Sequence, residues 1–352
     1  MHKGEAIQSK SMAGLQQPTL FTPSRSRAYS SLEGGTCVRQ LLAAEACEPM
    51  ARRIAAQHPD RFKLHPTQWG KFPDGTDKII IGGYTPMNEL AGQHVVLLCS
   101  FHDNDVTWSQ FQVMIVLLQS FIESLTVVLP FYPVGTMERC VVEGEVATAN
   151  TYAQMFSTLP SCGRPTRLMT YDIHTLQNRF YLSGATLASL HTTIPCLLPL
   201  LEPAGIDAIA FPDDGAAKRF KHMFDATRYE IIVCGKVRDG DTRVVTMQDG
   251  DATGRRVIIV DDLVQTGGTL YECGAKLLDM GAASVSAFVA HGVFANCDVW
   301  KRFARGGDRH VFSKFYVTNS IPTTTDRLPA KDVFEVIDLT DRLVRDLLRV
   351  PT

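Results

Sequence analysis

The stretch that decides the fold lies at residues 257–269 and reads VIIVDDLVQTGGT. Its opening residues are β-branched and apolar without alternation, which is typical of a parallel strand that is buried on both faces. Asp261 and Asp262 follow this strand, and a helical pattern runs over 270–280. A strand, a glycine-rich turn and a helix N-terminus favour anion binding, because backbone N–H groups and the helix dipole point at one place. The stretch therefore predicts a site for one phosphate group.

The acid pair distinguishes this turn from a nucleotide P-loop, which requires Gly-x-x-x-x-Gly-Lys-Ser/Thr and thus a lysine that is missing here. Carboxylates accept hydrogen bonds from the vicinal hydroxyls of a phosphorylated sugar, whereas they would repel the rest of a polyphosphate. The segment resembles the phosphoribosyl-pyrophosphate (PRPP) loop of type I phosphoribosyltransferases and of PRPP synthases. The alternative is an ordinary connection between a strand and a helix. We assign the sugar phosphate to Asp261, Asp262, Gln265, Thr266, Gly267, Gly268 and Thr269.

The composition indicates a globular protein of two domains of ordinary size, because the chain has 352 residues, of which 45% are hydrophobic and 20% charged. The formal net charge of −2 argues against a nucleic-acid or anionic-membrane partner. No apolar run is long enough to span a membrane. The nine cysteines are scattered singly, which favours reduced thiols and a cytoplasmic location over a disulfide framework or a zinc site.

The first 35 residues differ from the rest in composition, since they are rich in Ser, Gln and Thr. They contain both basic and acidic residues and show no clean amphipathic face. We expect a disordered tail, or alternatively a targeting segment that would send the chain to an organelle.

Two successive cycles of strands and helices follow this tail, which predicts a parallel α/β architecture with crossover helices. In the first cycle we expect two short helices within 35–57, strands at 78–82, 94–99, 125–129 and 167–171, and helices at 109–124, 143–159 and 184–190. In the second cycle we expect strands at 206–211, 230–234, 257–260, 283–291, 314–317 and 334–337, helices at 215–223, 270–280 and 341–350, and a hairpin-like insert at 238–255. The similar size of the cycles suggests a duplicated architecture.

Polar residues follow the carboxyl ends of these strands, where parallel α/β sheets bind their ligands. Alone, each group has a plain structural alternative: a hydrogen-bonded pair, a helix cap, a solvated basic turn or the opening of a helix. The groups are Glu138 and Arg139, Asp172 and His174, Asp213 and Asp214, Lys236 and Arg238, His291, and the run Thr318, Asn319 and Ser320.

Taken in order, these segments resemble those of the ribose-phosphate diphosphokinases, which are the PRPP synthases. The family has an Asp-Leu-His metal and ATP segment, a Pro-Asp-x-Gly segment and a catalytic Lys-x-Arg. The corresponding segments here are Asp172-Ile173-His174, Pro212-Asp213-Asp214-Gly215 and Lys236-Val237-Arg238. The matches run in the family's order from about residue 71 to residue 337. The phrases FPDDGA at 211–216 and VDDLVQTGGT at 260–269 look most like the plant-type, or class II, branch.

The resemblance implies an α/β fold of two successive phosphoribosyltransferase-like domains, each a mainly parallel sheet flanked by helices. It places an N-terminal domain on the ATP side at 36–195 and a C-terminal domain on the ribose 5-phosphate side at 196–352. The implied activity is Mg²⁺-dependent transfer of the diphosphoryl group of ATP to the 1-hydroxyl of ribose 5-phosphate, which gives PRPP and AMP for nucleotide biosynthesis. Because the family buries its active sites between neighbouring domains and subunits, a homo-oligomer is implied as well.

The resemblance also assigns roles to single residues. Lys236 and Arg238 are the catalytic pair, and their spacing places both side chains on one side of an extended segment, where both cations can reach the same phosphoryl oxygens. The expected Mg²⁺ ligands are His174 and Asp213, and the expected ATP-binding residues are Asp74, Glu138, Arg139 and His174.

The sequence departs from the class I enzymes in two places. The loop 134–139 carries one arginine and no lysine, and Thr76 stands after Asp74-Gly75 where class I has an acid. Both departures resemble the plant-type branch, which as a family is phosphate-independent and less selective for its nucleotide donor. Phosphate independence is therefore expected here.

Two other functions compete with this interpretation. A type I phosphoribosyltransferase shares the loop at 261–269, but it would not need the Asp-x-His segment, the Lys-x-Arg pair or a whole preceding α/β unit. A non-catalytic, synthase-associated subunit would be expected to lose a catalytic residue, whereas His174, Asp213, Lys236 and Arg238 are all present.

Overall fold

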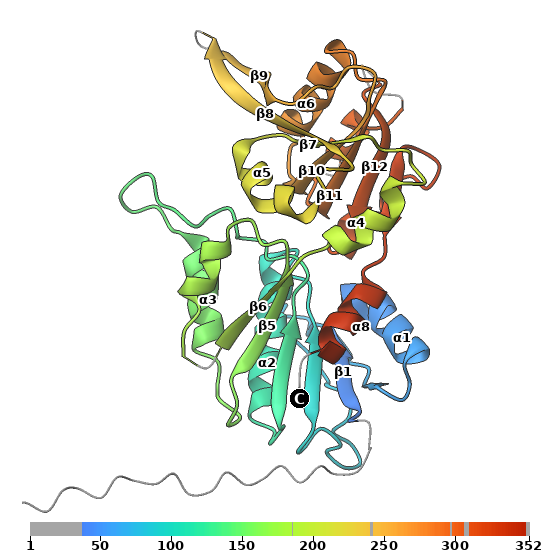
Figure 1. Cartoon of the computed structure of the whole chain (residues 1–352). Helices are drawn as coiled ribbons and strands as arrows, with labels where there is room; N and C mark the ends of the chain where they lie inside the picture. The colour runs from blue at the N-terminus through green and yellow to red at the C-terminus, as the bar shows by residue number, and fades with distance from the viewer. Residues whose placement is uncertain (1–36, 185, 240–241, 296–297, 306–309, 350–352) are drawn as a thin grey trace, which may run out of the picture. The chain divides into compact units, whose positions relative to one another are not determined.

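The computed structural model describes residues 37–349 except for 185, 240–241, 296–297 and 306–309, and the side chains of 236–245 also lie outside the description. The tail expected at 1–35 falls outside the described residues. Two sheets organise the rest, one of six and one of seven strands (Figure 1).

The first sheet is parallel at every strand pair and has the order β2-β1-β3-β4-β5-β6. Its strands are β1 (Arg39–Ala43), β2 (Phe62–Leu64), β3 (His94–Leu98), β4 (Ser124–Val128), β5 (Thr166–Tyr171) and β6 (Thr186–His191). The helices of this part are η1 (Glu45–Cys47), α1 (Glu48–Gln57), α2 (Asn104–Leu118), α3 (Thr148–Ser157) and η2 (Leu176–Tyr181).

The second sheet has the order β13-β12-β11-β10-β7-β8-β9 and is parallel except for the hairpin of β8 and β9. Its strands are β7 (Ala208–Phe211), β8 (Glu230–Asp239), β9 (Thr242–Asp249), β10 (Arg256–Val264), β11 (Ser284–Gly292), β12 (Phe312–Thr318) and β13 (Phe334–Ile337). The remaining helices are α4 (Ile194–Leu201), α5 (Asp214–Phe220), η3 (Lys221–Met223), α6 (Gly268–Asp279), η4 (Val299–Arg302), α7 (Pro322–Thr325) and α8 (Thr340–Arg349).

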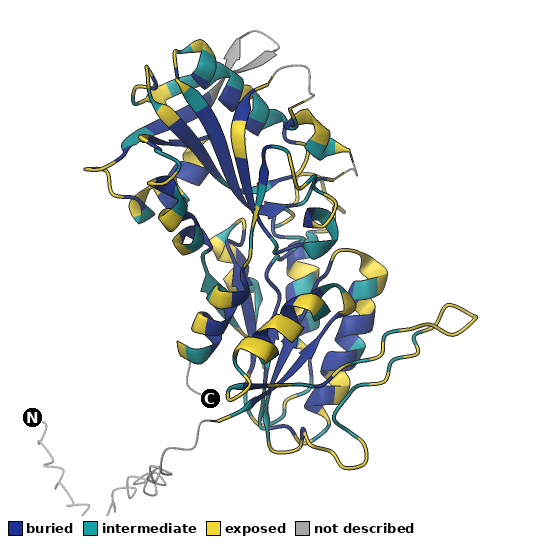
Figure 2. Cartoon of the chain, turned by 90° about the vertical axis from the view of Figure 1, so that its right-hand side faces the viewer, coloured by how far each residue is buried: buried dark blue, intermediate teal, exposed yellow. Residues whose placement is uncertain are grey.

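Helices cover both faces of each sheet. Successive residues of a strand point to opposite sides, so each strand contacts the helices on both faces. On the first sheet, Leu42 packs with residues of α2 and α3, while its neighbour Leu41 packs with residues of α1 and α8. Likewise, Ile259 of β10 packs with residues of α6, while Ile258 packs with residues of α4 and α5. Figure 2 shows the resulting buried strands between partly exposed helices. The expected fold of two mainly parallel sheets flanked by helices is confirmed.

The stretch at 257–260 is a central strand, as expected. Val257, Ile258, Ile259 and Val260 are all fully buried in β10, which lies between β7 and β11. The predicted hairpin at 238–255 is also present as the antiparallel pair of β8 and β9, although β8 already begins at Glu230.

Three predicted elements of the first sheet were wrong. β1 is a fully buried strand where we expected a short helix, and β6 is an edge strand where we expected a helical segment. In both cases pairing with a neighbouring parallel strand outweighs the local pattern. The expected strand at 78–82 is irregular and contributes an isolated bridge between Gln68 and Ile80.

The C-terminal helix α8 packs against the first sheet, although it follows the last strand of the second sheet in sequence. Its buried residues Leu343, Val344 and Leu347 belong to the apolar cluster that contains Leu41 of β1. Figure 1 shows α8 beside α1. The domain limits proposed from the sequence, 36–195 and 196–352, stay a prediction.

We expect Leu343→Ala to lower the free energy of unfolding by about 2–5 kcal/mol, because Leu343 is fully buried and its removal leaves a cavity. Arg345→Ala, at an exposed position of the same helix, is the control and should change the value by less than about 0.5 kcal/mol. Urea denaturation measures both. Equally small effects would contradict the packing of α8 on this core.

Within the described part of the chain, no helix combines the length and the apolar character that crossing a bilayer requires. The eight cysteines in that part are all free thiols.

Candidate active site

The turn between β10 and α6 requires glycine at residue 267. Gly267 has a φ of 73°, in the left-handed region that side chains disfavour, and it directly precedes the first residue of α6. A Cβ atom at this position would lie 2.2 Å from Cζ of Phe303. Gln265 and Thr266 are exposed on the turn, and Gly268 and Thr269 form the first turn of the helix. The arrangement directs the backbone amides of a helix N-terminus at the turn, as an anion site needs.

The two aspartates before the turn lie in the last part of β10. Asp262 is 6% exposed, and its Oδ1 accepts a hydrogen bond from the backbone N–H of Leu263 at 2.8 Å. Oδ1 of Asp261 accepts one from the N–H of Asp262 at 2.9 Å. Burial, together with the neighbouring charge of Asp262, raises the pKa of Asp261 well above its usual value. The two adjacent acids therefore differ in their tendency to ionise.

His174 connects the end of the first sheet with this acid pair. Its Nδ1 lies 2.6 Å from Oδ2 of Asp262, although 88 residues separate the two in sequence. This hydrogen bond raises the pKa of His174. Burial disfavours the charge on Asp262, yet the hydrogen bond and the charge of His174 outweigh it and hold the pKa of Asp262 below its usual value. This bond uses Nδ1 and does not involve the other ring nitrogen, Nε2.

Asp213 occupies the N-cap position of α5. Its Oδ1 accepts a hydrogen bond from the backbone N–H of Ala216 at 2.9 Å, and the residue is exposed. Asp213 is thus a helix cap, which was the structural alternative for this residue. The cap uses only Oδ1 of the carboxylate, so Oδ2 can bind another partner.

No cluster of three or more His, Cys, Asp or Glu side chains that could hold a metal occurs among the described residues. Among these residues, no set of protein ligands alone surrounds an ion. Mg²⁺ that arrives on a phosphate chain fits better, because it keeps several waters and takes one or two carboxylates from the protein. Asp213, with its remaining oxygen, and the half-exposed His174 suit that mode of binding.

Two further predicted residues, Glu138 and Arg139, lie together in the loop after β4. Nε of Arg139 donates to Oε1 of Glu138 at 2.9 Å, and the side chain of Arg139 is 85% exposed whereas that of Glu138 is 9% exposed. The hydroxyl of Tyr181 donates to the backbone carbonyl of Glu138 at 2.9 Å. Glu138 is therefore held in place, while Arg139 extends into solvent.

Asp74 stands apart from these residues, in an exposed turn. Its Oδ1 accepts hydrogen bonds from the N–H of Thr76 at 3.0 Å and from its hydroxyl at 2.7 Å. These bonds lower the pKa of Asp74, with the hydroxyl contributing most. In the described part of the chain, the structure shows no contact between Asp74 and His174 or Asp262.

Lys236 and Arg238 both lie on β8, directly beyond the buried residues Cys234 and Gly235. They pair across the hairpin with Val245 and Arg243 of β9. Their backbone is extended because β8 continues beyond the strand expected at 230–234, and their side chains lie outside the description.

His291 is fully integrated into the structure, which agrees with its plain structural alternative. Its Nδ1 lies 2.8 Å from the hydroxyl of Ser320, and its Nε2 lies 3.0 Å from the backbone carbonyl of Tyr171. Its ring also contacts Phe131.

Arg219 belongs to the same region, although the sequence motifs did not identify it. Its guanidinium donates to the backbone carbonyl of Ile173, next to His174.

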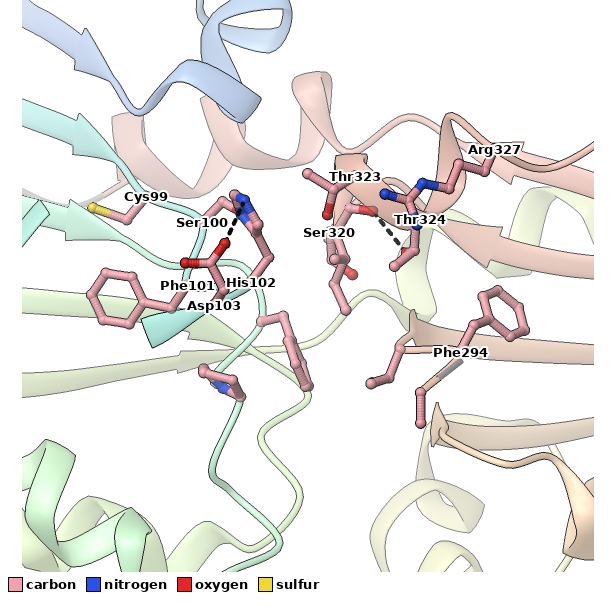
Figure 3. A pocket seen from close by; sticks show the side chains of 15 residues that line it. Cys99, Ser100, Phe101, His102, Asp103, Phe294, Ser320, Thr323, Thr324 and Arg327 are labelled. Carbon is pink, nitrogen blue, oxygen red and sulfur yellow. Dashed lines mark hydrogen bonds and ion pairs between the residues drawn. The ribbon is translucent and has the colours of Figure 1, made fainter. Parts of the chain in front are cut away.

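A cavity of about 570 Å³ lies at the ends of β3 and β12. Figure 3 shows Ser100, His102 and Asp103 on one side of it and Ser320, Thr323 and Thr324 on the other. Of the strand-end residues singled out in the sequence, Ser320 lines it, together with Val293, Phe294 and Ala295 of the segment after β11. The cavity lies next to the turn before α6, because the backbone N–H of the lining residue Ala295 donates to the carbonyl of Gln265 at 3.1 Å.

The chain resembles curated plant proteins over most of its length. It is 43% identical over 299 residues to "Ribose-phosphate pyrophosphokinase 4" of Arabidopsis thaliana, an alignment that covers 83% of this chain and 87% of the relative. It is 41% identical over 334 residues to "Ribose-phosphate pyrophosphokinase 3, chloroplastic" of the same plant, with 92% and 80% covered. No protein-family model matches the chain.

A solved structure has the same fold. The phosphoribosylpyrophosphate synthetase from Mycobacterium smegmatis superposes with a TM-score of 0.73 at 21% identity, over 88% of this chain and 98% of the other. At this identity the superposition supports the architecture of two sheets, whereas the plant relatives establish the kinship. The chain therefore belongs to the ribose-phosphate pyrophosphokinases, the diphosphotransferase enzymes that are also called PRPP synthases.

Proposed function

We propose that the chain transfers the diphosphoryl group of ATP to the 1-hydroxyl of ribose 5-phosphate in a Mg²⁺-dependent reaction, giving PRPP and AMP. The observation that carries the proposal is the 2.6 Å hydrogen bond between His174 and Asp262. It joins the segment proposed to bind ATP with the acid pair proposed to bind the sugar. A phosphoribosyltransferase would need the acid pair that binds the sugar, but it would not need the segment that binds ATP.

On the sugar side, the 5-phosphate binds at the N-terminus of α6. Gln265, Thr266, Gly267, Gly268 and Thr269 surround the position where the helix amides point. The carboxyl oxygens of Asp261 and Asp262, at the preceding strand end, accept hydrogen bonds from the 2- and 3-hydroxyls of the ribose. The 1-hydroxyl then faces away from the phosphate, toward the donor nucleotide.

On the nucleotide side, Asp74, Glu138, Arg139 and His174 bind ATP. Mg²⁺ bound with ATP supplies neutralisation of phosphate charge, with Asp213 and His174 as its ligands from the protein. Lys236 and Arg238 stand two residues apart on the extended β8, and alternate residues of a strand share one face. Both cations can then contact the β-phosphoryl oxygens.

The reaction breaks one P–O bond and forms another. The 1-hydroxyl oxygen attacks the β-phosphorus, the bond between that phosphorus and the oxygen bridging to the α-phosphate breaks, and AMP leaves with the bridging oxygen while the hydroxyl proton is released. This chemistry depends on alignment and on charge stabilisation more than on covalent assistance. The protein supplies the alignment from two sheets and the charge from β8.

Three finer properties belong to the proposal. The reaction is independent of inorganic phosphate, since the loop 134–139 and Thr76 follow the plant-type pattern. The chain acts as a homo-oligomer. It acts in the cytoplasm, with an organelle as the alternative that the chloroplastic name of one relative supports. A fluorescent fusion of residues 1–36 distinguishes these two locations.

The purified chain with ribose 5-phosphate, Mg²⁺ and ATP tests the activity, with AMP and PRPP quantified in the presence and absence of inorganic phosphate. Equal formation of AMP and PRPP at both phosphate levels supports the proposal. Consumption of added PRPP with a nucleobase, without formation of AMP, would instead identify a phosphoribosyltransferase. No turnover despite binding of ATP would favour a non-catalytic subunit.

We expect Asp262→Asn to weaken the binding of ribose 5-phosphate by about tenfold to a hundredfold, because hydrogen bonds to a charged acceptor contribute about 1.5–3 kcal/mol. Calorimetric titration without ATP measures this affinity. The control is Asp326→Asn, which removes an exposed carboxylate of the same part of the chain and should leave the affinity unchanged. An unaltered affinity in Asp262→Asn would remove Asp262 from the sugar site.

A further inference from the structure

Arg219 lies in the last turn of α5 and reaches across to the end of β5. Its Nη1 donates a hydrogen bond to the backbone carbonyl of Ile173, and its Nη2 lies 4.0 Å from Oδ1 of Asp172. The guanidinium carbon lies 5.1 Å from the centre of the Phe220 ring, and the side chain is 14% exposed. The guanidinium is therefore fixed by three contacts instead of moving freely in solvent.

Asp172 shows why a cation is needed at this position. Its side chain is 1% exposed, and its Oδ2 accepts hydrogen bonds from the backbone N–H of Thr193, at 2.7 Å, and from the Thr193 hydroxyl. Oδ1 has no hydrogen-bond partner among the described residues. An isolated buried carboxylate is unfavourable, and Arg219 is the cation that lies beside this oxygen.

The backbone at Asp172 is strained as well, since its φ is 36°. A residue other than glycine keeps such a conformation when its surroundings hold it there. The bonds of Asp172 to Thr193 and the bond from Arg219 to the next carbonyl hold it here. The segment then continues directly into His174, so the strained turn determines where the imidazole points.

One short helix thus contacts both sides of the proposed nucleotide site. Asp213 caps the beginning of α5, and Arg219, near its end, binds the residue that precedes His174. Building on the proposed function, we propose that Arg219 is a positioning residue: it fixes His174 of the first sheet relative to Asp213 and Asp262 of the second. It acts through the backbone at Ile173 and does not touch the substrates.

An arginine suits this role better than a lysine. Its planar guanidinium can donate to the Ile173 carbonyl and face the Asp172 carboxylate at the same time, whereas an ammonium is a single point charge on a flexible stem. Residues that orient ligands of a metal site typically change affinity or activity by about 10- to 100-fold when they are replaced. A lysine at residue 219 should therefore retain part of the affinity for Mg²⁺-ATP that an apolar side chain at this position loses.

The test uses the full chain and titrates two probes separately in a calorimeter: Mg²⁺-ATP without sugar, and ribose 5-phosphate without nucleotide. We expect Arg219→Met to weaken Mg²⁺-ATP binding by about 10- to 100-fold and to change ribose 5-phosphate binding by less than about twofold. Arg219→Lys should give an intermediate affinity for Mg²⁺-ATP. A purely structural role would not produce this selectivity or this order of the variants.

The matched control is Arg228→Met. Arg228 also stacks on a neighbouring ring, 5.4 Å from the centre of Tyr229, and also pairs with a carboxylate, that of Glu202 at 3.0 Å, but it does not contact the His174 segment. Both affinities should stay unchanged in this variant. Equal weakening of the two ligands by Arg219→Met, or no weakening of either, would overturn the inference.

Measuring PRPP formation by the wild-type chain distinguishes a failure of this inference from a failure of the proposed function. If the wild type forms PRPP and Arg219→Met binds Mg²⁺-ATP as tightly as the wild type, the positioning role alone is wrong. If the wild type forms no PRPP, the proposed function fails, and the inference that rests on it falls too.

Discussion

Replacing Lys236 with alanine should lower kcat by about a thousandfold and leave the affinity for ribose 5-phosphate within about twofold of the wild-type value. The proposed role of Lys236 is to neutralise charge on the β-phosphoryl oxygens as the bond to AMP breaks. Such an interaction is stronger in the transition state than in the ground state, so its loss appears in turnover and not in sugar binding. Steady-state kinetics and calorimetric titration of ribose 5-phosphate measure the two quantities.

The control for this experiment is Lys331→Ala, which removes an exposed lysine far from β8 in sequence. Its kcat should remain within about twofold of the wild-type value, as expected for a surface change. If Lys236→Ala weakened sugar binding as much as it lowered turnover, Lys236 would bind the ground state and the catalytic assignment would be wrong. Arg238→Ala should behave as Lys236→Ala does, because both cations are proposed to contact the same β-phosphoryl oxygens.

The central part of the second sheet could be predicted from the sequence because its signal is local. Val257, Ile258, Ile259 and Val260 form an uninterrupted apolar run that only a strand buried on both faces accommodates, and all four are fully buried. The turn at Gly267 was equally predictable, since a glycine between a strand and a helix marks a left-handed backbone.

The first sheet was harder to predict because its outer strands carry mixed patterns. β1 reads RQLLA, which fits a helix as well as a strand, and its identity depends on β2 and β3, which pair with it from later in the chain. β6 reads TLASLH and is mostly half-buried on the sheet edge. Propensity does not distinguish the two structures in such segments, and the available neighbour decides.

The contacts that assemble the site were also beyond local reasoning. The motifs named His174 and Asp262 as members of one site, but they did not predict that the two are bonded to each other across 88 residues. Arg219 carries no motif of its own, although it binds the carbonyl next to His174. The sequence thus indicates which strand ends bear functional residues. Only the structure shows which contacts hold the ends of the two sheets together.

That arrangement gives the phosphate turn a structural role in addition to its binding role. Gly267 packs against Phe303, a residue of the aromatic cluster that also contains Phe294, Phe312 and Phe315. A change at the turn is therefore transmitted into the core of the second sheet. The consequence can be measured separately from the chemistry.

Gly267→Ala should cost about 2–5 kcal/mol in unfolding free energy and weaken ribose 5-phosphate binding by at least about tenfold. The left-handed φ of 73° costs an alanine about 1–2 kcal/mol, and its Cβ, 2.2 Å from Phe303, adds about 1–3 kcal/mol of overpacking. Relief of that clash moves the backbone whose amides bind the phosphate, so affinity falls together with stability.

The matched control is Gly254→Ala. Gly254 has a similar φ of 68°, but apart from its chain neighbours no residue lies within 4 Å of its Cβ position, so only the backbone cost of about 1–2 kcal/mol remains. Urea denaturation and calorimetric titration of ribose 5-phosphate are measured on both variants. The affinity should be unchanged in Gly254→Ala, because this glycine is not part of the turn. If the two variants lost equal stability and both kept full affinity, neither the contact with Phe303 nor the assignment of the phosphate to this turn would hold.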